Sequence, residues 1–129
     1  MTSELSVLAW SVVLGLVHIG VAAAAVTHQR GLAWNVSARD GTAAPLAGVA
    51  ARLARAQANF FETFPLFAAL VLGVVVAGKA DAQTLLGAQV YLWARVAYLP
   101  LYAFGIPYVR TIAFGVAVWG LLVLLRALL

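Results

Sequence analysis

Residues 52–65, RLARAQANFFETFP, lead two arginines, an asparagine and a glutamate straight into an apolar segment. On an α-helix these polar residues recur at spacings of three, four and three, so they share one face. They are Arg52, Arg55, Asn59 and Glu62. A charged face that enters an apolar segment needs a partner. The stretch therefore predicts either a structural contact between helices or a binding site.

The composition places the chain among integral membrane proteins. Of its 129 residues, 65% are hydrophobic and only 9% are charged, and the mean hydropathy is +1.03. So little polar surface could not cover a soluble globule. The net charge of +4 is spread over separate loops, which indicates membrane orientation rather than a groove for nucleic acid. No nucleic-acid partner is predicted.

Thiol and metal chemistry by the chain itself is not expected. The sequence contains no cysteine, so disulfides, thiolate metal sites and a cysteine nucleophile are excluded, and any thiol must be imported. His18 has no acidic or histidine partner at a metal-ligand spacing, which favours a satisfied packing histidine or an interfacial group. No metal site is predicted.

The hydrophobic pattern predicts a single domain, residues 1–129, of the all-α class: an integral membrane bundle of four transmembrane helices. The expected spans cover approximately residues 5–27, 58–78, 84–104 and 111–128. The N-terminus lacks the positive region of a signal peptide, so the first span should remain as an anchor. Residues 63–78 alone are too short to cross a bilayer, so the second span must include Asn59 and Glu62. Its helix should begin near Leu46, with Pro45 in the first turn.

The third expected span carries a second polar stripe around Arg95. A charge in the middle of a span costs about 3 kcal/mol, so Arg95 should face the bundle interior and be paired. Tyr91, Tyr98 and Tyr102 lie on the same helical face. Positive charge is concentrated in the first and third loops, which should therefore be cytoplasmic, with both termini on the other side. Glu62 and Arg95 then lie at matched depth and are expected to meet.

The expected pair of Glu62 and Arg95, taken alone, is equally consistent with a structural salt bridge and with a functional site. The surrounding residues favour a site, because a single carboxylate cannot neutralise four guanidinium groups. A ligand bearing carboxylates would supply the missing anion, since guanidinium binds carboxylate in bidentate geometry. The polar residues toward the cytoplasmic half are Arg52, Arg55, Asn59, Glu62, Arg95, Tyr98, Tyr102 and Arg110.

Two patterns in this set resemble a known family. The first is Arg-Ala-x-x-Asn-x-x-Glu at residues 55–62, followed by Phe64-Pro65. The second is Ala-Arg-x-x-Tyr-x-x-x-Tyr at residues 94–102, with an arginine, Arg110, after the next loop. With both patterns on the expected spans, the chain resembles the MAPEG family, the membrane-associated proteins in eicosanoid and glutathione metabolism, and most of all its prokaryotic branch. The resemblance covers nearly the whole chain.

The resemblance implies a four-helix subunit in a homotrimer. Glutathione would bind as a co-substrate between neighbouring subunits at the cytoplasmic side, and a lipophilic substrate would enter from the bilayer. Arg110 matches the arginine that stabilises the glutathione thiolate in catalytic members, and Glu62 would receive the amino group of the tripeptide. The other implied glutathione contacts are Arg55, Asn59, Arg95, Tyr98 and Tyr102, with Arg52 in the same set and Arg30 as a looser match.

Some positions depart from the family pattern. Thr63 stands where some relatives have a tyrosine, and Arg110 aligns by position rather than by strict spacing. Arg30 corresponds to an arginine near the end of the first helix, or is only a positive anchor at the cytoplasmic face.

The function expected from residues and resemblance is that of a membrane glutathione transferase or peroxidase acting on lipophilic electrophiles or lipid hydroperoxides. The alternative is a non-catalytic scaffold of the same architecture that binds lipid or a partner. A small four-span multidrug transporter is disfavoured, because such proteins place their acidic residue in the first span. The expected location is a bacterial inner membrane, with the active site toward the cytoplasm.

Overall fold

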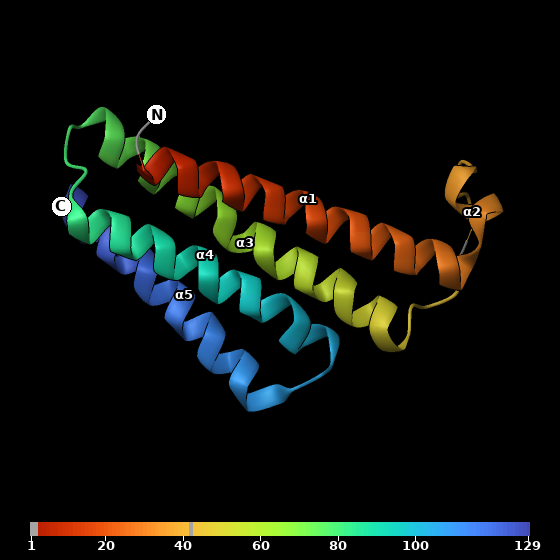
Figure 1. Ribbon diagram of the computed structural model, residues 1–129. Helices are drawn as coiled ribbons and strands as arrows, with labels where there is room; N and C mark the ends of the chain where they lie inside the picture. Colours follow the sequence, from red (N-terminus) through yellow and green to blue (C-terminus); the bar gives the residue numbers. More distant parts are fainter. Residues whose placement is uncertain (1–2, 42) are drawn as a thin grey trace.

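The computed structural model describes residues 3–41 and 43–129, and this part of the chain is all-helical. Four long helices run side by side, and one short helix lies at an end of the bundle (Figure 1). The helices are α1 (Ser3–Arg30), α2 (Leu32–Val36), α3 (Gly48–Val76), α4 (Ala82–Ala103) and α5 (Pro107–Leu128). The short α2 was not expected from the sequence, and α3 begins at Gly48, so Pro45 precedes the helix instead of occupying its first turn.

The two ends of the bundle differ in the connections they carry. The long α1–α3 connection and the α4–α5 turn lie at one end, and the α3–α4 turn lies with the described ends of the chain at the other (Figure 1). We call the first the arginine end, because Arg30, Arg52, Arg55 and Arg110 lie on its helices and turns. The other is called the opposite end.

Local sequence explains where α4 and α5 start. The Asp81 side chain accepts a hydrogen bond from the backbone N–H of Thr84, and the Thr84 hydroxyl accepts one from the backbone N–H of Asp81, which makes a capping box. Pro107 occupies the first turn of α5, where a missing N–H has no cost. Gly78 and Gly105 follow α3 and α4 with φ of 68° and 71°, a conformation that ends a helix most easily at glycine.

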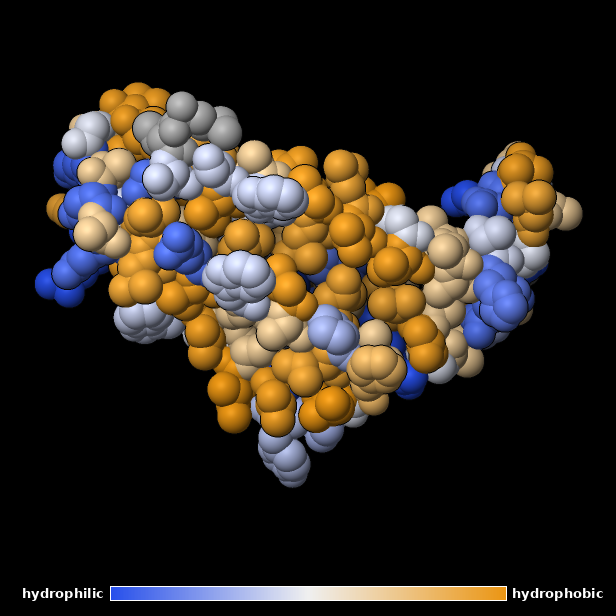
Figure 2. Space-filling model, viewed as in Figure 1, coloured by the Kyte–Doolittle hydropathy of each residue, from blue (hydrophilic) through white to orange (hydrophobic). Residues whose placement is uncertain are grey.

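The exterior of the bundle suits lipid. The helices α1, α3 and α5 are each long and apolar enough to cross a membrane, whereas the glutamines, tyrosines and arginine of α4 lower its hydropathy. Large apolar side chains such as Trp93 (67% exposed) and Leu66 (57% exposed) point outward. Orange hydrophobic residues dominate the middle of the face in Figure 2, and blue hydrophilic residues gather toward the two ends. The protein is an integral membrane protein.

The core lies where α3, α4 and α5 meet. The Phe67 ring stacks on the Tyr91 ring with centroids 4.1 Å apart, and the Tyr91 hydroxyl is 2.9 Å from the Thr63 hydroxyl. The α4–α5 pair is the most extensive in the bundle. A Cβ atom at Gly120 would lie only 2.6 Å from the carbonyl oxygen of Gly87, so the two backbones are in direct contact. This core holds α4 at a defined rotation and thereby positions its polar stripe.

Candidate functional site

A cavity of about 230 Å³ opens between α3, α4 and α5 toward the arginine end. We call it the arginine–tyrosine pocket, and its lining residues are Asn59, Tyr98, Tyr102, Arg110, Thr111 and Phe114. The first four are polar residues that the sequence singled out. Thr111 and Phe114 were missed, although Phe114 lies one helical turn after Arg110 on the same face of α5. This four-residue spacing is the sequence signal from which Phe114 could have been predicted.

Arg95 is the buried cation of the site. Its side chain is fully buried, and Nη1 donates to the Asn59 side-chain oxygen at 2.7 Å. The guanidinium carbon lies 4.2 Å from the centre of the Tyr98 ring and 5.5 Å from that of Phe60. Nε and Nη2 have no hydrogen-bond partner in the described chain. An amide and two ring faces only partly compensate a buried charge, so Arg95 keeps unused capacity for an anion.

The expected ion pair between Glu62 and Arg95 is not formed, and the two charges interact only electrostatically at longer range. Asn59 takes the hydrogen bond from Arg95, and Glu62 is exposed on the outside of α3. Equal depth along the bundle does not by itself bring Glu62 and Arg95 together, because the rotation of each helix about its axis also decides where a side chain points. The buried face of α3 follows Phe60, Thr63 and Phe67, which turns the neighbouring Glu62 outward.

Tyr102 joins two further arginines at the mouth of the pocket. Nε of Arg55 donates to the Tyr102 hydroxyl at 3.2 Å, and the guanidinium carbon of Arg110 lies 4.5 Å from the Tyr102 ring centre. Tyr98 meets Tyr102 edge-on, with ring centroids 5.5 Å apart. Cations from α3, α4 and α5 therefore surround a pair of tyrosine rings on α4.

Arg52 and Arg30 are engaged with backbone carbonyls instead. Nε of Arg52 donates to the Ala103 carbonyl at 2.8 Å, near the end of α4. Nε and Nη2 of Arg30 both donate to the Ala44 carbonyl, at 3.1 and 2.8 Å, within the α1–α3 connection. Neither arginine belongs to the lining of the pocket. Arg52 nevertheless lies beside the pocket, since Ala103 directly follows Tyr102.

A histidine lies behind the buried arginine. The ring of His18 stacks on Phe60 with centroids 4.8 Å apart, and neither ring nitrogen has a hydrogen-bond partner in the described residues. His18 therefore packs in the core as expected, but its nitrogens are not satisfied. No group of three or more metal-ligating side chains comes together in residues 3–41 and 43–129.

The geometry defines the chemistry that this site can perform. Guanidinium groups bind carboxylates with geometric specificity, and a cation close to a thiol lowers the thiol pKa and stabilises the thiolate. Tyrosine hydroxyls and the Asn59 amide add neutral hydrogen bonds. The pocket suits a small anionic ligand, and a thiol held near Arg110 would be activated.

Fold and site together define an all-helical integral membrane protein with a cationic, tyrosine-lined pocket at one end. The model of the MAPEG family matches residues 7–129, nearly the whole chain, and the protein belongs to this family. No curated protein sequence matches it. The family is associated with glutathione and includes transferases and peroxidases as well as non-catalytic members. Membership supports a glutathione-related function or a related one for this protein.

Proposed function

We propose that the protein is a glutathione-dependent membrane transferase or peroxidase. The observation that carries this proposal is the buried Arg95, which has two guanidinium nitrogens without a hydrogen-bond partner in the described chain and lies against a pocket that also presents Arg110. The described residues supply no carboxylate that bonds Arg95. An anionic ligand would supply the missing charge, and glutathione is the anionic ligand associated with this family.

In the proposed complex, the carboxylates of glutathione interact with Arg55 and Arg52 on α3, at the edge of the pocket. Arg55 lies at the mouth of the pocket, where its Nε already donates to a phenol oxygen, and Arg52 lies close by. Asn59, Tyr98 and Tyr102 supply hydrogen bonds from the pocket walls, and Arg95 supports this wall from behind. Glu62 is exposed and has no hydrogen bond within the described chain, so its carboxylate is free to accept the ligand's ammonium group.

Arg110 is proposed as the catalytic residue. Its guanidinium stabilises the thiolate of bound glutathione, and the thiolate sulfur is the nucleophile. With an electrophilic substrate, sulfur forms a bond to carbon and the leaving group departs with its electron pair. With a hydroperoxide, sulfur attacks the terminal oxygen, the O–O bond breaks, and the released alkoxide takes a proton. A second glutathione then converts the sulfenic acid to a disulfide and water.

The size of the pocket favours an assembly of several subunits. A cavity of about 230 Å³ is smaller than the roughly 300 to 1,000 Å³ of small-molecule sites. Arg55 bonds Tyr102 of the pocket, and Arg55 and Glu62 are both exposed, so a neighbouring subunit could enclose them. We therefore propose a homotrimer of four-span subunits, in which α4 crosses the membrane as well as α1, α3 and α5, and Arg30 of one subunit approaches the pocket of the next.

The second substrate is proposed to enter from the bilayer, because the helices around the pocket expose apolar side chains. The positive charge at the arginine end would orient the site toward the cytoplasm of a bacterial inner membrane.

The test of the proposal is Arg110→Ala in detergent-solubilised protein. We expect the thiolate absorbance on adding glutathione and the conjugation of an aryl halide to fall together, by about 100-fold for conjugation. Arg39→Ala is the matched control, since Arg39 is exposed and, among the described residues, bonds only Asn35 and Ser37 in the α1–α3 connection. Unchanged absorbance and unchanged conjugation in Arg110→Ala would refute the assigned role.

The alternative function is a non-catalytic scaffold that binds lipid or a protein partner. Calorimetry with glutathione separates the two, because a scaffold should bind glutathione weakly or not at all. The surplus of guanidinium groups in and beside the pocket favours the enzyme.

A further inference from the structure

A second groove lies between α4 and α5 toward the opposite end of the bundle, away from the arginine–tyrosine pocket. Its volume is about 440 Å³, and its lining residues are Gln83, Leu86, Trp119, Leu122, Val123 and Arg126. We propose that this groove binds one acidic phospholipid, with the phosphate on Arg126 and an acyl chain along Trp119 and Val123.

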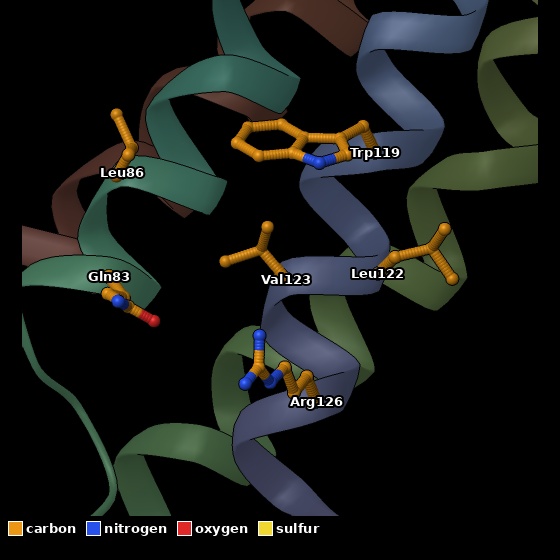
Figure 3. Close-up of a pocket in the computed structure, with 6 residues that line it drawn as sticks. All are labelled: Gln83, Leu86, Trp119, Leu122, Val123 and Arg126. Atoms are coloured by element: carbon orange, nitrogen blue, oxygen red, sulfur yellow. The ribbon is translucent and has the colours of Figure 1, made fainter.

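The lining of the groove changes from polar to apolar along the helix axes. Gln83 lies at the start of α4 and Arg126 near the end of α5, so both mark the outer end of the groove. Leu86 lies about one turn deeper on α4, and Val123 and Trp119 lie about one and two turns deeper on α5. Figure 3 shows the Trp119 indole extending from α5 toward α4, with Arg126 at the other end of the row. A phospholipid has the same order, with its headgroup at the interface and its chains toward the bilayer centre.

The guanidinium of Arg126 is available for a phosphate. Arg126 is exposed and has no hydrogen bond or ion pair within the described chain. Two acidic side chains near this end have other partners: Asp81 accepts from the backbone of Thr84, and the buried Glu4 accepts from the Thr84 hydroxyl. A planar guanidinium binds phosphate in bidentate geometry, so charge complementarity favours an anionic headgroup.

The floor of the groove is a close contact between two helices. A Cβ atom at Gly87 would lie 2.9 Å from a methyl carbon of Val123 and 3.1 Å from the Gly120 carbonyl, so α4 and α5 touch beneath the groove. An acyl chain can therefore lie over this contact without separating the helices.

A second copy of the protein is a poorer occupant than a lipid. In the proposed homotrimer the neighbouring subunit lies against Arg55 and Glu62, away from this groove, so a second copy would have to pair here by a twofold contact that brings two copies of the same surface together. The two Arg126 guanidiniums would then approach each other without an anion, which like-charge repulsion opposes.

The experiment is native mass spectrometry of the full-length protein in detergent, titrated with phosphatidylglycerol or with phosphatidylcholine carrying the same acyl chains. We expect one phosphatidylglycerol per chain at low lipid concentration and weaker binding of phosphatidylcholine. Arg126→Gln should weaken phosphatidylglycerol binding about fivefold, whereas Arg126→Lys should keep most of it. Lys79→Gln is the matched control, because Lys79 is an exposed cation at the same end but outside the groove. Inorganic phosphate alone should not displace the lipid.

Several results would overturn the proposal. These are equal affinity for the two lipids, equal losses in Arg126→Gln and Lys79→Gln, and displacement of the lipid by inorganic phosphate. Efficient disulfide cross-linking between copies that carry Leu122→Cys, undiminished by added lipid, would show that a second copy covers the groove. The chain has no native cysteine, so this cross-link is unambiguous. Unchanged thermal unfolding of Arg126→Gln serves as the folding control.

Discussion

The guanidinium carbon of Arg110 lies 4.5 Å from the centre of the Tyr102 ring, and the hydroxyl of the same tyrosine accepts a hydrogen bond from Arg55. One side chain of α4 thus positions a cation from α5 with its ring and a cation from α3 with its oxygen. The two interactions are chemically distinct, so mutation can separate them.

Two substitutions of Tyr102 separate the contact of its hydroxyl with Arg55 from the contact of its ring with Arg110. Tyr102→Phe removes the acceptor for Arg55 and keeps the ring beside Arg110. We expect glutathione affinity to fall about fivefold, the equivalent of one hydrogen bond of about 1 kcal/mol, with the thiolate absorbance at saturation unchanged. Tyr102→Leu also removes the ring and should lower that absorbance. An equal loss of thiolate in both variants would show that the ring does not position Arg110.

Substitutions of Asn59 test whether the buried Arg95 is compensated by an anionic ligand. Asn59→Leu removes the side-chain acceptor that bonds Arg95, and the unpaired buried charge should lower the free energy of unfolding by about 3 kcal/mol. Asn59→Asp supplies a carboxylate at the same place, so stability should be kept while glutathione affinity falls about tenfold or more. Thermal unfolding in detergent and calorimetry measure the two quantities. Undiminished glutathione binding by Asn59→Asp would contradict the idea that the charge of Arg95 is compensated by a bound anionic ligand.

Glu62→Gln distinguishes a ligand contact from a structural salt bridge. Since Glu62 is exposed and makes no hydrogen bond in the described chain, the free energy of unfolding should change by no more than about 0.5 kcal/mol. Glutathione affinity should fall, whereas a glutathione analogue without the α-amino group should bind the variant and the wild type equally. A stability loss of several kcal/mol would instead reveal a structural partner of Glu62.

The glycine contact between α4 and α5 can be tested independently of function. A Cβ atom at Gly120 would lie 2.6 Å from a backbone oxygen of Gly87, so Gly120→Ala must push the helices apart. The expected loss is about 2 kcal/mol in the free energy of unfolding. Gly115→Ala, on the same helix with nothing within 4 Å of the added atom, should be neutral or slightly stabilising because alanine favours the helix. Equal thermal stability of the two variants would rule out the close contact.

Much of the candidate site could be predicted from the sequence, because helical spacing decides which side chains share a face. Spacings of three and four residues grouped Arg55 with Asn59 and Arg95 with Tyr98, and the structure brings these groups together across α3 and α4. The family could also be predicted, since its two patterns are local in sequence. The short helix α2 was missed.

The sequence by itself determined the membrane environment and the four long helices, since hydropathy and spacing depend only on residue order. Only the tertiary structure decided which charges meet. Rotation of α3 about its axis is set by packing of the Phe60 and Phe67 face, and it gives Arg95 the amide of Asn59 instead of the carboxylate of Glu62. The groove at Arg126 likewise is formed by side chains of two helices that come into contact at Gly87 and Gly120. Such contacts join residues far apart in the chain, and their geometry follows from side-chain packing in three dimensions.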